Sequence, residues 1–247
     1  MPGSLLNAVK LTDFRHPLAW FTTRRSGALR SIDLTLIVST LRDQLSAVLA
    51  NGLAGEPLEH AHQVGAVAAI LWQACQEAGL QCTLVGGSAI EIHAPGIYRS
   101  DDIDVVIEAP ASSGLRERIG QVFGGLGLIR AGRHWRLGDL FVEVPGHEIT
   151  DPTDIVRVGS GVFRIVRKEV LLADRVVGFK HWRYTGYGQQ AIDMIAAFGD
   201  DLEMGWLEER LVREGSWDAF EALQDLAGSD ASVTVDSLTA LLERLHN

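Results

Sequence analysis

The sequence predicts an α/β protein, in which a small mixed sheet with helices is flanked by N-terminal helices and a C-terminal helical region. Short apolar runs bounded by glycine or acidic residues fall between residues 82 and 166, as is typical of strands. On both sides of this stretch, apolar residues recur at intervals of three and four, as on amphipathic helices. We therefore expect an N-terminal arm and helix over 1–57, a core over 58–167 and a helical region over 168–247.

Two helices are predicted on the N-terminal side. Residues 1–31 have no decisive periodicity, but 32–52 has a helical pattern with Asp33 as a candidate cap and Gly52 at its end. The next helix lies within 55–80, with Pro57 near its first turn and Gly79 after its last. Its predicted buried face recurs at three and four residues. That face consists of Val64, Val67, Ala68, Leu71 and Cys75.

The core alternates between strand and helix patterns. Residues 82–86 and 102–109 read as strands, and 88–94 and 112–127 read as helices. The segments 128–139 and 140–149 are typical of a strand pair that turns at Gly138 and Asp139. One or two further strands are expected within 154–166, and the pattern is helical from Lys168 onward.

Charge and composition limit the possible functions. The net charge is −10, and the residues from Asp200 onward hold 12 acidic against 3 basic side chains, which argues against broad nucleic-acid binding. Ten of the 22 basic residues lie between Arg130 and Arg183, so a local basic patch is possible. With two cysteines, no membrane-length apolar run and no pattern of a signal peptide, we expect a cytoplasmic protein without a membrane partner.

Two carboxylates begin the second predicted strand of the core. Strand side chains alternate between faces, so Asp102 and Asp104 point the same way while Ile103 points to the opposite layer. Two like charges held this close are costly unless a cation lies between them. Hard divalent ions such as Mg²⁺ bind oxygen ligands and leave room for substrate phosphates. The pattern favours a metal site at the start of this strand.

A glycine turn precedes these carboxylates by a short distance in the sequence. Gly86 and Gly87 end one strand pattern and Ser88 opens a helix, where free N–H groups and the helix dipole favour anions. Phosphate binding at this turn and metal binding at the next strand would together suit a metal-bound nucleoside triphosphate.

The combination of turn and carboxylates resembles the signature of the polymerase-β-like nucleotidyltransferase superfamily. The resemblance is carried by Gly86-Gly87-Ser88, thirteen intervening residues, and Asp102-Ile103-Asp104 followed by VVI. The run YRSDDID is similar to one in small bacterial members, the minimal and AbiEii-like nucleotidyltransferases. The motif covers 84–107, and a compatible order of elements extends to about residue 185. The resemblance implies the core fold of that superfamily, with nucleotide bound at the glycine turn.

The superfamily pattern also implies a third carboxylate on a neighbouring strand. Glu143, between Val142 and Val144, is the best match. With Asp102 and Asp104 it would bind two Mg²⁺ ions, and it can help to deprotonate the attacking hydroxyl in an in-line attack on the α-phosphorus. The competing acids for this position are Glu108, Asp139 and Glu148.

A weaker resemblance covers 169–195, which is similar to the helix after the core in AbiEii-like proteins. It implies that Lys180 and Arg183 reach the triphosphate and that Asp193 matches a later acid of the family. The chain departs from that pattern at Arg175, where the family usually has lysine.

Together these features predict an enzyme that moves a nucleoside monophosphate from a nucleoside triphosphate to an acceptor hydroxyl. A toxin-like enzyme acting on RNA or protein is favoured slightly over an antibiotic-modifying one. A non-catalytic, antitoxin-like binding module is the alternative, with the acidic C-terminal region as its docking surface. An antitoxin or a second copy of the chain is a possible partner.

Overall fold

The computed structural model describes residues 34–50, 56–109, 114–229 and 232–246. These residues group into two compact units. Of the described residues, the first unit takes those up to Leu84, Asp101–Ile149 and Thr153–Ile165. The second takes Val85–Ser100, Thr150–Pro152 and the described residues from Val166 onward. The division at residues 57 and 167 stays a prediction, and most of the predicted N-terminal arm lies outside the described residues.

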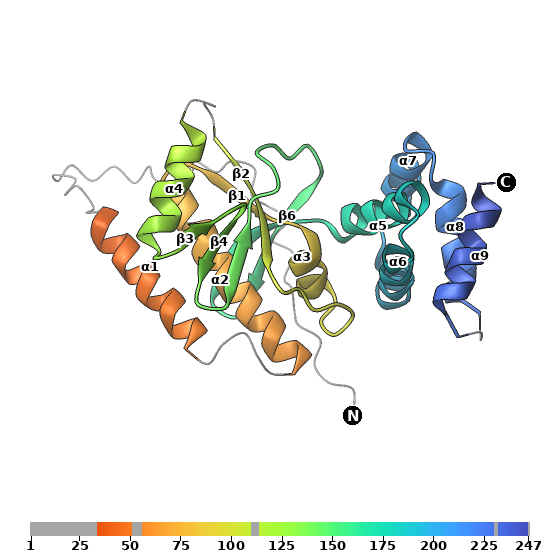
Figure 1. Ribbon diagram of the computed structural model, residues 1–247, viewed down its shortest axis with the longest axis horizontal. Helices are drawn as coiled ribbons and strands as arrows, with labels where there is room; N and C mark the ends of the chain where they lie inside the picture. Colours follow the sequence, from red (N-terminus) through yellow and green to blue (C-terminus); the bar gives the residue numbers. More distant parts are fainter. Residues whose placement is uncertain (1–33, 51–55, 110–113, 230–231, 247) are drawn as a thin grey trace. The chain divides into compact units, whose positions relative to one another are not determined.

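A seven-stranded mixed sheet forms the centre of the first unit (Figure 1). Its strands stand in the order β3-β4-β5-β2-β1-β7-β6. Their bounds are β1 Gln81–Leu84, β2 Ile103–Glu108, β3 Ile129–Ala131, β4 His134–Leu137, β5 Leu140–Glu143, β6 Thr153–Val158 and β7 Gly161–Val166. The predicted α/β class is confirmed, since helices precede, interrupt and follow this sheet along the chain.

Three helices of the first unit, α1 (Leu34–Leu49), α2 (Pro57–Glu77) and α4 (Leu115–Gly125), contact one another, and α2 also contacts the sheet. The predicted face of α2 is confirmed, because all five of its residues are buried. Gly65 lets this helix approach β6 closely, since a Cβ added there would lie 2.7 Å from Val158. Burial of this apolar face is the main stabilising contribution that α2 makes.

Strand β2 lies inside the sheet and joins its two halves. It pairs antiparallel with β1, so that Thr83 stands opposite Val106. On its other side it pairs parallel with β5, so that Asp104 stands opposite Glu143. The side chains of Ile103 and Val105 are buried, and those of Asp102 and Asp104 are half-buried, as the two-residue period requires.

Strands β3, β4 and β5 form two consecutive hairpins. The predicted turn at Gly138 and Asp139 is confirmed, and Gly138 takes a φ of +60° there. The prediction of one strand over 128–139 was wrong, because Gly132 and Arg133 form a second two-residue turn between β3 and β4. Gly132, with a φ of +66°, adopts the left-handed conformation that such turns need.

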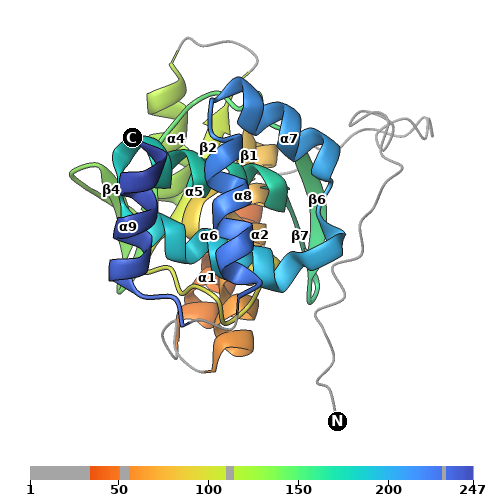
Figure 2. The same cartoon turned by 90° about the vertical axis from the view of Figure 1, so that its right-hand side faces the viewer.

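The second unit is helical (Figure 2). Helix α3 (Gly86–His93) packs against α5 (Lys168–Trp182), and the His93 ring nitrogen Nε2 lies 2.8 Å from the carbonyl oxygen of Val166. The remaining elements are α6 Thr185–Phe198, a 3₁₀ turn Gly199–Asp201, α7 Met204–Arg213, α8 Trp217–Ala227 and α9 Val235–Leu245. The helical pattern predicted from Lys168 onward is thereby confirmed.

Across the described ranges, no helix is both long and apolar enough to span a membrane. The cysteines Cys75 and Cys82 are both buried as free thiols. A hydrogen bond between the Cys82 thiol and Cys75, together with burial, raises the pKa of Cys82.

Candidate functional site

The carboxylates at the start of β2 share a face with the acid predicted to join them. Asp104 on β2 stands opposite Glu143 on β5, while their buried neighbours Ile103 and Val142 are paired one position earlier. Neighbouring strands are about 4.8 Å apart, and side chains at paired positions point to the same face. The sheet therefore brings Glu143 alongside the Asp pair.

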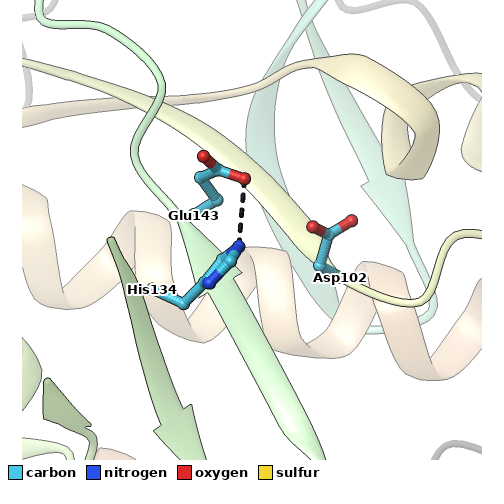
Figure 3. Close-up of side chains that lie close together, drawn as sticks. All are labelled: Asp102, His134 and Glu143. Carbon is cyan, nitrogen blue, oxygen red and sulfur yellow. Dashed lines mark ion pairs between the residues drawn. The ribbon is translucent and has the colours of Figure 1, made fainter. Parts of the chain in front are cut away.

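A histidine that the sequence patterns did not single out lies opposite Glu143 on its other side. His134 on β4 pairs with Glu143 in the antiparallel register, and its Nε2 lies 3.2 Å from Glu143 Oε2. Figure 3 shows both side chains turned toward each other, with Asp102 nearby. Asp104, Glu143 and His134 thus form one row across three adjacent strands.

Asp102, His134 and Glu143 are close enough to hold one ion together. One ligand atom of each lies within 4.8 Å of the others, and all three side chains are half-buried. Asp104 is not in this trio, although it is the register partner of Glu143. Among the described residues, this trio is the group of acidic, histidine or cysteine side chains that meets this spacing.

The surroundings of Glu143 are only partly basic. Its carboxylate lies 3.4 Å from Nε of Arg133, whose side chain is 77% exposed, and Glu143 itself is 19% exposed. An exposed arginine contributes little, since solvent screens such pairs. Bringing Asp102 close to Glu143 in a partly buried place therefore favours a bound cation that balances their charge.

The predicted glycine turn lies in the second unit at the start of α3. Gly86 has a φ of +63°, and a Cβ on Gly87 would come within 2.5 Å of the Tyr98 ring, so both positions require glycine. The first intrahelical bond runs from Ala89 N–H to the Val85 carbonyl, so Gly86 and Gly87 lie in the first turn of the helix. The hydroxyl of Ser88 is buried and donates to the Val85 carbonyl at 3.2 Å.

The predicted basic residues also lie in the second unit. Lys180 Nζ donates to Asp218 at 2.6 and 2.8 Å and to the Gly215 carbonyl at 2.7 Å. Arg183 caps the end of α5 in the left-handed region, with a φ of 55°, and is exposed. Asp193 accepts a hydrogen bond from Gln189 one turn earlier. The charge of Lys180 is thus matched within its own unit.

The other candidates for the third carboxylate lie away from the Asp pair or are engaged elsewhere. Glu108 at the end of β2 accepts a hydrogen bond from Ile149 N–H at 3.3 Å and pairs with Arg164 at 3.4 Å. Asp139 lies in the exposed turn between β4 and β5, and Glu148 is exposed after β5. Of the four candidates for the third carboxylate, Glu143 is the one that stands in register with Asp104 and in the trio with Asp102.

The chain is similar to two solved structures. One is an antigenic nucleotidyltransferase-like protein from Paracoccidioides brasiliensis, with 14% identity, a TM-score of 0.46, and coverage of 64% of this chain and 92% of that one. The other is the antibiotic-resistance factor ANT(2'')-Ia, with 16% identity, a TM-score of 0.39, and coverage of 74% and 96%. No protein-family model and no curated protein matches the chain. Because both TM-scores are low, the function proposed below rests on this chain's own residues.

Proposed function

We propose that the chain is a metal-dependent nucleotidyltransferase that moves a nucleoside monophosphate from a nucleoside triphosphate to an acceptor hydroxyl. The observation that carries the proposal is the convergence of Asp102 and Glu143, with Asp104 in register beside Glu143. Carboxylates gathered on one face at a strand start are the donor set of a divalent ion such as Mg²⁺. The side chains of this site therefore offer the oxygen donors that a divalent metal ion needs.

In this proposal, Asp102, Asp104 and Glu143 hold the metal, and two ions can share these three carboxylates. A bound divalent ion supplies positive charge against the phosphate oxygens and favours ionisation of the acceptor hydroxyl. We assign to Glu143 the role of accepting the proton of that hydroxyl, because its half-buried carboxylate lies beside Asp102.

We assign phosphate binding to the N–H groups of Gly86, Gly87 and Ser88 at the start of α3. The N–H groups at a helix start attract anions, and the absence of side chains at the two glycines lets a phosphate approach the backbone. The Ser88 hydroxyl is not needed for this contact, since it is already a donor to Val85. Arg183 is exposed and available to the triphosphate, whereas Lys180 would have to leave Asp218 first.

We infer that the acceptor is RNA, as in a toxin-like enzyme, ahead of a protein or an antibiotic. The exposed hairpin of β3 and β4 presents Arg130, Arg133 and Arg136, and Arg133 lies directly beside Glu143. A positively charged strand edge next to the acidic site suits a polyanionic acceptor, which binds through its phosphates. A compact antibiotic would not need such an edge.

The test is a labelling screen of the full-length protein with Mg²⁺, or in parallel Mn²⁺, and each of the four α-³²P-labelled nucleoside triphosphates. Total cellular RNA, cell lysate and an aminoglycoside panel serve as acceptors, and Asp104→Asn is the inactive control. We expect label on RNA with the wild type and a loss on the order of a hundredfold or more with Asp104→Asn. If no acceptor is labelled and no triphosphate binds, the chain is a binding module and the enzyme proposal is wrong.

A further inference from the structure

We propose that His134 is a metal ligand beside Asp102 and Glu143, and that the site therefore selects a first-row transition-metal ion such as Mn²⁺ over Mg²⁺. The inference deepens the proposed function and rests on its metal site. It goes beyond that function by adding a nitrogen donor to the carboxylates and by naming the class of ion that results.

The spacing of the donors fits a shared ion. Ligand atoms about 2.1 Å from one ion lie about 3.0 Å apart when adjacent and about 4.2 Å apart when opposite. His134 Nε2 and Glu143 Oε2, at 3.2 Å, already have the separation of adjacent ligands. All ligand atoms of the trio lie within 4.8 Å of one another, so side-chain rotation alone can bring them to the separations of a shared ion.

The imidazole is held in place by the hairpin. The two-residue turn between β4 and β5 sets His134 opposite Glu143, so both side chains leave the same face of the sheet. The Phe141 ring meets the imidazole edge-on at a centroid distance of 6.2 Å, and Arg136 lies over that phenyl ring. In Figure 3 the imidazole points toward the Glu143 carboxylate, on the side where Asp102 lies. A preset ring loses little rotamer freedom when it binds an ion.

The type of donor atom decides which metal ion binds more tightly when His134 is a ligand. Mg²⁺ takes oxygen ligands and gives up water reluctantly, so a neighbouring imidazole adds little to its binding. Imidazole nitrogen is a good ligand for first-row transition metals, whose affinity for such a site rises from Mn²⁺ to Co²⁺. Removal of His134 should therefore weaken binding of Mn²⁺ and Co²⁺ much more than binding of Mg²⁺.

If His134 has a purely structural role, its removal should raise the metal affinity instead of lowering it. If the imidazole only pairs with Glu143, a divalent ion has to compete with it for that carboxylate. Removing the imidazole would then raise the affinity for all divalent ions by a similar factor. Arg133→Ala serves as a comparison for this case, because Arg133 contacts the same carboxylate and cannot bind a metal, and its Nε also lies 3.4 Å from His134 Nε2.

The experiment compares full-length wild type, His134→Ala, the bulkier His134→Gln and Arg133→Ala by calorimetric titration with Mg²⁺ and with Mn²⁺ at one fixed pH. The exposed His147→Ala corrects for adventitious imidazole binding. We expect both His134 variants to lower Mn²⁺ affinity on the order of tenfold or more and Mg²⁺ affinity less than about threefold. The absorption bands of bound Co²⁺ should also shift in both variants, whereas Arg133→Ala should strengthen binding of both ions slightly.

Equal changes for Mg²⁺ and Mn²⁺, or a gain for both ions in His134→Ala, would overturn the inference. Circular dichroism of each variant checks the fold, and His134→Gln decides between the two roles if the smaller variant unfolds. The outcome is separable from that of the proposed function. Selective Mn²⁺ binding through His134 without any nucleotidyl transfer would refute the proposed function alone. Transfer by a protein whose Mn²⁺ affinity does not depend on His134 would refute this inference alone.

Discussion

The two ends of β2 both carry carboxylates and use them differently. At its last residue, Glu108 pairs with Arg164 and accepts the Ile149 N–H, and Arg164 also donates to Thr153 and to Gln81. Opposite charge and hydrogen bonds thus tie four strands together at this end. At the start of β2, by contrast, Asp102 lies close to the like charge of Glu143 and Asp104 is its register partner, while Glu143 also pairs with Arg133 and His134.

Under the proposed function, the difference separates a structural carboxylate from a metal-binding one. A half-buried acid that serves the fold is placed with its counter-charge in the same chain, because an uncompensated charge there costs free energy. Acids that converge on one another raise the free energy of the metal-free state, and a bound cation lowers it. Under the proposed function, the Glu108 end serves stability and the Asp102 end binds the ion.

The largest expected effect comes from Glu143→Gln. The amide keeps the shape of the side chain but removes a charge from the acidic end, so affinity for divalent ions should fall on the order of a hundredfold. The free energy of unfolding without metal should stay within about 1 kcal/mol of the wild type or rise, since a like charge is relieved. Calorimetric metal titration and urea denaturation measure the two quantities. An unchanged metal affinity would contradict the assignment of this end.

An intermediate effect is expected from Glu108→Gln, the same chemical change at the other end of the strand. It leaves Arg164 without its carboxylate, so the free energy of unfolding should fall by about 1–3 kcal/mol. Metal affinity should not change, because Glu108 lies at the opposite end of β2 from Asp104. Urea denaturation with the same titration checks both statements. If this variant lost metal affinity as strongly as Glu143→Gln, the two ends of β2 would not differ in their roles.

The smallest effect is expected from Gln81→Ala. Its side-chain oxygen accepts from Arg164 at 2.7 Å and helps to aim that guanidinium at Glu108. Because the amide is exposed, its loss should lower the free energy of unfolding by only about 0.5 kcal/mol. In a double-mutant cycle with Glu108→Gln the two losses should couple, since both act through Arg164. If the two losses of unfolding free energy were strictly additive, Gln81 would not act through Arg164.

Much of this contrast could be predicted from local patterns. The two-residue period placed Asp102 and Asp104 on one face, and Gly138 with Asp139 marked the turn before β5. That turn also fixes the register, because residues equally far from it stand opposite each other. Counting outward from it puts His134 opposite Glu143, so the histidine could have been found by extending the turn prediction into a pairing.

Other features depend on contacts between distant parts of the chain, which local patterns do not encode. The parallel pairing of β2 with β5 joins Asp104 to Glu143 across a helix and two strands. The ion pair of Lys180 with Asp218 joins residues 38 apart, so a lysine that resembled a phosphate ligand lies against α8. The second turn at Gly132 was missed because apolar and basic residues continue through it without a proline or an asparagine.

The start of β2 and the end of β5 are expected to share a divalent ion, and the proposed function depends on it. Anomalous diffraction from crystals of the full-length protein soaked in Mn²⁺ tests this most directly, because the signal locates the ion itself. We predict a peak between the carboxylates of Asp102 and Glu143, within about 2.5 Å of an oxygen from each. Well-occupied Mn²⁺ elsewhere on the protein, with no density between these two side chains, would contradict the claim that Asp102 and Glu143 share a divalent ion.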